Sequence, residues 1–162
     1  MRIVLRIWPV VAFVLVALAM RIPFASRAPT HIDECNFIRA LDRFDVASFR
    51  PHAPGYVLFV AAGRVVRAFV GDGLLALQIA NGIGAGVMAY ALGRAASLLY
   101  GPAAGRWTAG FALASPLAWS YGFGALSYPA AGGATALAVW QAVEVIRGLR
   151  TRLPLAAALL GL

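Results

Sequence analysis

Long apolar runs separated by short polar segments occupy most of this chain. They cover residues 3–22, 55–70, 74–93, 103–121 and 132–146, and a sixth begins at Leu155. An apolar stretch of about 20 residues is the length of helix that crosses the roughly 30 Å hydrocarbon core of a bilayer. The pattern therefore predicts an all-α protein, a polytopic transmembrane helical bundle that forms a single membrane domain over residues 1–162.

Two of these runs do not fit a simple span. The run 55–70 would form a helix only about 24 Å long and contains Arg64 and Arg67, so we predict that it lies in the membrane interface. The run from Leu155 ends at Leu162 and is too short to cross. We therefore expect that the chain is a fragment, or that its end needs further spans or another membrane subunit, and that the chain alone has no activity.

Composition agrees with a membrane protein and argues against a nucleic-acid-binding one. Hydrophobic residues make up 62% of the chain, above the roughly 45 to 50% of soluble domains. The net charge of +8 comes from arginines alone among the basic residues. These arginines lie at the ends of apolar runs and form no interleaved patch, so we expect contacts with membrane lipids and none with nucleic acid.

The arginines also predict the topology, because cytoplasmic ends of spans collect basic residues. If 55–70 does not span, the arginines near the N-terminus, within 94–106 and after residue 146 all fall on the cytoplasmic side. The segment 23–73 is then one large outer loop, and 122–131 is a second outer loop. We predict a multi-pass protein of the plasma (inner) membrane with a cytoplasmic N-terminus.

The chemically capable residues concentrate in the first outer loop, where four of the six acids lie within thirteen residues, Asp33 to Asp45, and where both histidines also lie. Residues 31–44 have the pattern of an amphipathic helix that begins after Thr30. Asp33 and Glu34 flank its apolar face, where a carboxylate is costly unless a partner, a metal or a catalytic task holds it. The alternative is structural, because Thr30 and Asp33 have the spacing of a capping box.

Three other features have two interpretations each. His52 lies in the segment Pro51–Gly55 and is either a turn residue or a rigidly presented functional group. Gln78 and Asn81 are expected to hydrogen-bond to neighbouring helices rather than to bind substrate. Gly82 and Gly86 form a GxxxG pair, which favours close helix packing over a phosphate-binding loop.

The first loop resembles that of polyprenyl-phosphate-dependent glycosyltransferases of the GT-C membrane fold. The likeness rests on Asp33-Glu34 just after the first span and on Pro51-His52-Ala53-Pro54-Gly55-Tyr56. This family includes protein O-mannosyltransferases and lipid A aminoarabinose transferases. The likeness covers the chain as the N-terminal part of such a protein, whose first loop carries an acid and two juxtamembrane helices.

The resemblance implies a glycosyltransferase of the cell envelope that moves a sugar from a lipid-linked donor to an acceptor at the outer face. Asp33 would act on the acceptor hydroxyl, with Glu34 beside it, and would hold a divalent metal if one binds. His52 and Tyr56 would contact substrate. The leaving phosphate would be held by three arginines, namely Arg27, Arg39 and Arg50.

One departure from the family concerns the second outer loop. Family members often carry a second acid there, whereas residues 126–132 contain none. Metal dependence therefore stays open, and no cofactor is assigned. The alternative functions are a non-catalytic membrane subunit or scaffold that packs through its glycine-rich helices and, less favoured, a transporter fragment, in which charges would lie near the bilayer midplane.

Overall fold

The computed structural model describes the backbone of residues 4–149 and the side chains of residues 8–149. Every regular element in this range is a helix, so the predicted all-α class is confirmed. The run that begins at Leu155 lies outside the described residues. In chain order the elements are α1 (Val4–Arg21), η1 (Ile22–Phe24), α2 (Ile32–Asp42), η2 (Val46–Ser48), α3 (Val57–Val70), α4 (Gly73–Tyr100), α5 (Pro102–Ala114), α6 (Pro116–Ser120) and α7 (Tyr128–Ile146).

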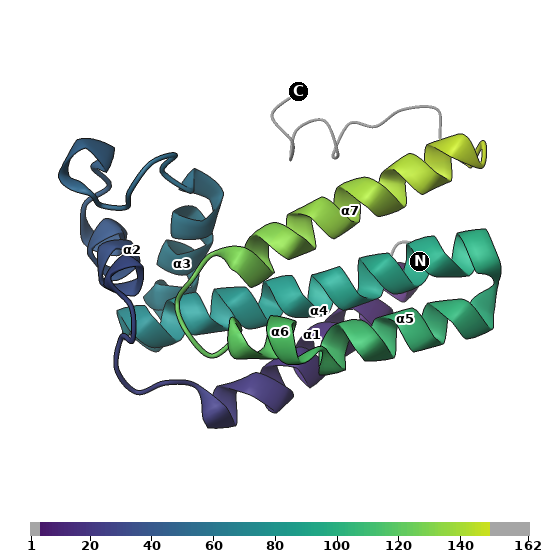
Figure 1. Ribbon diagram of the computed structural model, residues 1–162, viewed down its shortest axis with the longest axis horizontal. Helices are drawn as coiled ribbons and strands as arrows, with labels where there is room; N and C mark the ends of the chain where they lie inside the picture. The colour runs from purple at the N-terminus through teal and green to yellow at the C-terminus, as the bar shows by residue number, and fades with distance from the viewer. Residues whose placement is uncertain (1–3, 150–162) are drawn as a thin grey trace.

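Helix α4 is the centre of the structure and packs against α1, α3, α5 and α7 (Figure 1). Its glycines allow this close approach. A Cβ atom on Gly86 would come within 2.5 Å of the Val14 Cα atom in α1, and one on Gly84 within 2.5 Å of the Ala130 Cα atom in α7. Gly82 likewise faces α1. The prediction that Gly82 and Gly86 serve helix packing is confirmed.

Three predicted boundaries differ from the structure. Helix α4 continues to Tyr100 and turns at Gly101, whose φ of 94° favours glycine, so the expected connection 94–106 is mostly helical. Helix α7 begins at Tyr128, before the expected 132, with a proline in its first turn, where a missing N–H costs nothing. The expected span 103–121 is two helices, because Pro116 lacks an N–H and forces Ser115 out of the helical conformation.

By length and composition, α4 is the one helix within the described residues that could cross a membrane. The most apolar 18-residue stretch of this helix is 67% buried inside the molecule. The stretch Trp8–Phe24 is apolar but shorter.

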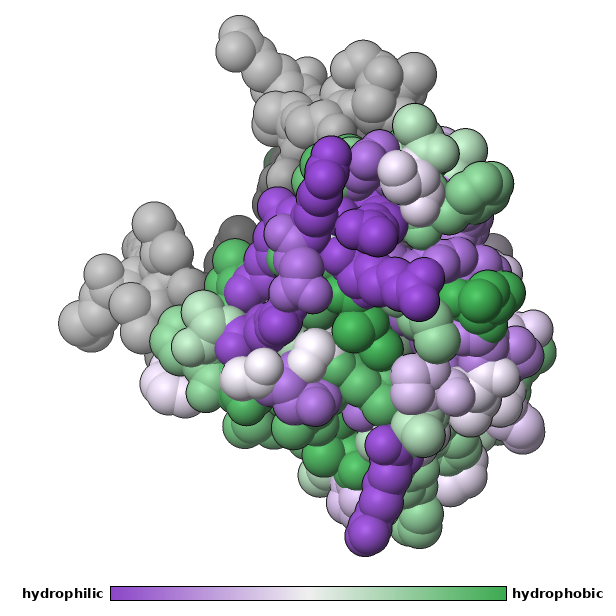
Figure 2. All heavy atoms as spheres, turned by 90° about the vertical axis from the view of Figure 1, so that its left-hand side faces the viewer, coloured by the Kyte–Doolittle hydropathy of each residue, from purple (hydrophilic) through white to green (hydrophobic). Residues whose placement is uncertain are grey.

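The described loops gather at the two ends of the helix bundle. The first loop meets the second where the N–H of Ser26 donates to the carbonyl of Phe123. We call this end, with residues 22–56 and 121–127, the loop end; Figure 2 faces it and shows many hydrophilic side chains gathered there. At the other end, the Arg147 side chain donates to the carbonyl of Leu99, so α7 ends beside the α4–α5 turn.

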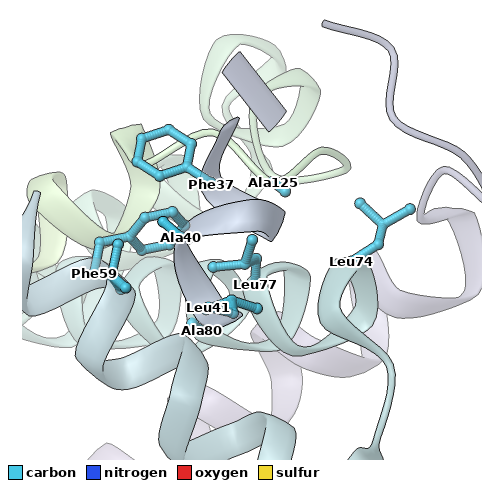
Figure 3. Close-up of a cluster of buried hydrophobic side chains, with 9 residues drawn as sticks. Phe37, Ala40, Leu41, Phe59, Leu74, Leu77, Ala80 and Ala125 are labelled. Atoms are coloured by element: carbon cyan, nitrogen blue, oxygen red, sulfur yellow. The ribbon is translucent and has the colours of Figure 1, made fainter. Parts of the chain in front are cut away.

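A core cluster fixes α2 and α3 on α4 near the loop end. Phe37 and Leu41 of α2 meet Phe59 of α3 and Leu77 of α4, and all four are buried (Figure 3). Ala125 of the second loop completes the cluster. The helix that carries Asp33 and Glu34 is therefore held by apolar contacts with three other segments.

Candidate functional site

The first turn of α2 presents the two neighbouring acids to different partners. Glu34 is buried, with 1% of its surface exposed. Its Oε2 atom accepts the N–H of Thr30 at 2.6 Å, and its Oε1 atom accepts the N–H of Ala125 at 3.0 Å. A Cβ atom on Gly124 would collide with Oε1, so only glycine allows this approach. The Glu34 carboxylate thus joins the first loop to the second.

This geometry corrects the predicted capping box. Helix α2 begins at Ile32 after His31, and the His31 side chain makes no capping bond. Glu34, rather than Asp33, reaches back to the backbone N–H of Thr30. The reason is that Glu34 has the longer side chain and is the third residue of the helix, the position from which an acid can reach the preceding N–H groups.

Asp33 faces His52 instead. The Oδ1 atom of Asp33 lies 3.4 Å from the Nδ1 atom of His52, and the two side chains are 45% and 27% exposed. Nδ1 has no correctly aligned hydrogen bond within the described residues, so this pair is a close polar contact. Asp33 therefore combines solvent access with a neighbouring imidazole, which is an arrangement suited to proton transfer.

Aromatic rings hold the imidazole of His52 in place. The ring lies 5.6 Å from that of Phe37 and 5.1 Å from that of Tyr56, both edge-on. The turn before α3 produces this contact, because the N–H of Gly55 donates to the carbonyl of His52 and Gly55 has a φ of 100°. The structure therefore brings together Asp33, His52 and Tyr56.

The three arginines expected to bind the phosphate belong to the loop end, but none of them forms an ion pair with Asp33. Arg27 and Arg39 are exposed, and Arg50 is half-buried. Within residues 8–149 none of them has an ion pair with an acid. The backbone of Arg50 pairs with that of Asp45 in an isolated β-bridge. Their guanidinium groups are thus available to an anion.

A metal centre has limited support in the described part of the chain. No group of three or more histidine, cysteine, aspartate or glutamate side chains there could hold an ion. Asp33 and His52 would supply two ligands, and Glu34 is directed to backbone N–H groups. Metal dependence therefore stays open.

Two hollows lie near this site. A cavity of about 430 Å³ lies beside Glu34, between the two loops, and Thr30, His31 and Tyr121 also line it. A groove of about 530 Å³ runs between α3, α4 and α7 and is lined mainly by apolar side chains. Tyr56 lies in the groove wall, and its ring also packs against that of His52, so the Asp33–His52 pair lies one residue away from the groove.

Sequence analysis missed several features at this end. These are the groove and the bonds of Gln78 and Asn81 to loop carbonyls. The Gln78 amide donates to Ser26 and Phe123, and the Asn81 amide donates to Gly124 and Leu126. These two residues support the loops rather than other helices, which corrects their expected partners. Their spacing of three on one helix face, near the start of α4, is the signal that could have revealed them.

Comparisons with known proteins add no relative. A scan of family models, a search of curated proteins and a search of solved structures each returned no match. The class that the described residues establish is an all-α helical protein with a polar loop end, and its function must be argued from that end.

Proposed function

We propose that this chain is the N-terminal part, or the whole, of a multi-pass membrane glycosyltransferase that uses a polyprenyl-phosphate-linked sugar. The membrane setting is supported by large apolar side chains exposed along the bundle. Leu15 of α1, Trp107 and Phe111 of α5, and Ile146 of α7 are all exposed. Apolar surface this extensive is unusual for a soluble monomer and fits contact with lipid tails.

The observation that carries the proposal is that Tyr56 both lines the apolar groove and contacts His52 of the Asp33–His52 pair. A lipid-linked donor needs an apolar path for its chain that ends beside polar catalytic groups. The groove supplies such a path, and Tyr56 joins it to His52. The loop end would then lie at the outer face, with the N-terminus in the cytoplasm, as the arginine distribution predicts.

The proposed reaction needs one base and a stabilised leaving group. Asp33 accepts the proton of the acceptor hydroxyl while that oxygen attacks the anomeric carbon of the donor. The bond from this carbon to the phosphate oxygen breaks, and the polyprenyl phosphate leaves with the electron pair. General base catalysis of this kind contributes about 10² to 10⁴-fold. Arg27, Arg39 or Arg50 would bind the phosphate through charge-assisted hydrogen bonds.

The test is sugar transfer by protein reconstituted in lipid, with polyprenyl-phosphate donors of long and short chains. Ala134→Trp would fill the groove, because Ala134 lines it. We expect this variant to raise KM for a long-chain donor more than for a short-chain one. Ala103→Trp is the control, since Ala103 is exposed on α5 and does not line the groove. Absence of transfer from every such donor, by the chain and by any longer form of it, would favour the scaffold alternative.

A further inference from the structure

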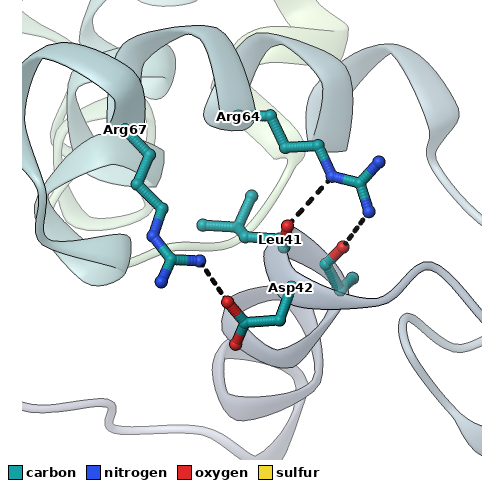
Figure 4. Close-up of polar contacts among 5 residues, drawn as sticks. Leu41, Asp42, Arg64 and Arg67 are labelled. Carbon is teal, nitrogen blue, oxygen red and sulfur yellow. Dashed lines mark hydrogen bonds and ion pairs between the residues drawn. The ribbon is translucent and has the colours of Figure 1, made fainter.

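Arg64 is an arginine within the apolar helix α3, and its contacts explain its presence. Its Nε atom donates to the carbonyl of Leu41 at 3.0 Å, and its Nη2 atom donates to the carbonyl of Ala40 at 2.9 Å (Figure 4). Both carbonyls belong to the last turn of α2, where a helix cannot supply N–H partners. Arg64 therefore caps the C-terminal end of α2 from a different helix.

The chemistry of this cap requires a guanidinium. Its planar fork donates two parallel hydrogen bonds to adjacent carbonyls, whereas an ammonium group acts as a single point charge. A positive charge at a helix C-terminus also interacts favourably with the helix dipole. Arg64 thus stabilises the C-terminal end of α2 both through two directional hydrogen bonds and through its positive charge.

Close packing next to Arg64 sets the distance between the two helices. A Cβ atom on Gly63 would come within 2.9 Å of the Leu41 Cδ2 atom and within 2.7 Å of the Leu77 Cδ2 atom. Apolar packing of this kind tolerates sliding and tilting better than two directional hydrogen bonds do. The two hydrogen bonds of Arg64 therefore add a directional constraint on the orientation of α2 to the apolar contacts that hold it.

Asp33 and the cap lie at opposite ends of α2. The separation along the helix from Asp33 to Leu41 is about 12 Å, at about 1.5 Å per residue. A tilt of about 5° about the capped end would then displace Asp33 by about 1 Å, and a misplacement of that size can cost up to about 10²-fold in rate. The 3.4 Å contact of Asp33 with His52 would not survive unchanged.

We propose that Arg64 is a positioning residue that acts through α2 to keep Asp33 against His52. The consequence for catalysis rests on the proposed function, whereas the consequence for α2 does not. Arg67 offers a matched control on the same helix. Its Nη1 atom lies 2.6 Å from Asp42 Oδ1 at the same end of α2, but Asp42 is 68% exposed, and exposed pairs of this kind contribute little.

Cys35 provides a direct measurement of α2, because it is the single cysteine of the chain and its side chain is half-buried next to Glu34. In the full chain reconstituted in lipid, we expect Arg64→Gln to raise the maleimide-labelling rate of Cys35 by about tenfold or more, since the loss of each charge-assisted hydrogen bond corresponds to at least about that factor. Arg67→Gln should change it less than about twofold. An Arg64→Gln rate equal to that of the wild type overturns the proposal, whether or not sugar transfer is detected.

Arg64→Lys serves if Arg64→Gln fails to fold, because the lysine keeps the charge but cannot bridge both carbonyls. Its labelling rate should lie above that of the wild type, and an unchanged rate would again overturn the proposal. In an active preparation, Arg64→Gln should lower kcat and leave the donor KM unchanged. This loss should disappear in a His52→Gln background, since the pair that Arg64 positions is already broken. An equal loss of kcat in both backgrounds would mean that Arg64 acts only on general stability.

Discussion

Glu34 accepts the backbone N–H of Ala125, a residue 91 positions further along the chain, while its neighbour Asp33 faces His52. The two acids that look equivalent in the sequence therefore have separate tasks. Glu34 is buried and hydrogen-bonded to two loops, which makes it a structural link. Asp33 stays partly exposed, and it is the better candidate for the acid that accepts a proton.

Replacing Asp33 separates a catalytic role from a structural one. In the completed protein, we expect Asp33→Asn to abolish sugar transfer with little loss of folded protein, because the amide keeps the shape but cannot accept the proton. Asp42→Asn should retain nearly full turnover, since it removes only an exposed ion pair worth about 0 to 1 kcal/mol. The measurement is turnover per folded molecule, and equal turnover of the two variants would exclude the catalytic role.

Removing the carboxylate of Glu34 should loosen the second loop. Glu34→Ala deletes charge-assisted hydrogen bonds to the N–H groups of Thr30 and Ala125, each worth about 1.5 to 3 kcal/mol. We expect the Ala125 amide to exchange its hydrogen about tenfold faster or more. Asp33→Asn is the control and should leave that exchange rate as it is. If the Ala125 amide of Glu34→Ala exchanges its hydrogen as slowly as in the wild type, other contacts hold the loop.

Asp45 should titrate at unusually low pH. The hydrogen bond from the Ser48 hydroxyl is the largest cause that lowers the pKa of its carboxylate, and desolvation opposes it. The backbone N–H groups of Ser48 and Ala47 and the charge of Arg43 lower the pKa further. Because the folded-state pKa is depressed, the carboxylate stabilises the loop above pH of about 3.9, and this is lost as the pH falls through the folded pKa. In a pH titration followed by carbon-detected NMR, the pKa of Asp45 should be higher in Ser48→Ala than in the wild type. The same pKa in both proteins would contradict this prediction.

The close packing of α4 against α1 can be tested with a single methyl group. Gly86→Ala places a Cβ atom within 2.5 Å of the Val14 Cα atom, so the helices must separate. We expect a loss of about 1 to 3 kcal/mol in the free energy of unfolding in detergent. Gly110→Ala is the matched control, because nothing lies within 4 Å of its Cβ position. There the higher helix propensity of alanine should stabilise the protein by up to about 1 kcal/mol.

The proposed topology predicts which residues share a side of the membrane. In a Cys35→Ser background, cysteines at Ser48 and Asp72 should react with an impermeant reagent from the outside. A cysteine at Tyr100, which is exposed at the α4–α5 turn, should react only after the membrane is opened. Labelling of Ser48→Cys and Asp72→Cys from opposite sides would show that α3 crosses the membrane.

Local pattern was enough to predict the helices and the location of the chemistry. Apolar periodicity is a property of neighbouring residues, so the ranges of α1, α2 and α3 follow from it to within two residues. The concentration of acids and histidines in the first loop is equally visible. The break at Pro116 also has a local signal, which the apolar run around it concealed.

The partners of those residues depend on the tertiary structure. Packing of α2 and α3 on α4 decides that Glu34 meets Ala125 and that Arg64 caps α2, because both contacts join segments far apart in the chain. Hydropathy alone counts Arg64 as an argument against a membrane span. In the structure, its guanidinium donates hydrogen bonds to the unpaired carbonyls at the end of α2. Hydrogen-bond partners of this kind are selected by distance and direction in space, which no local pattern encodes.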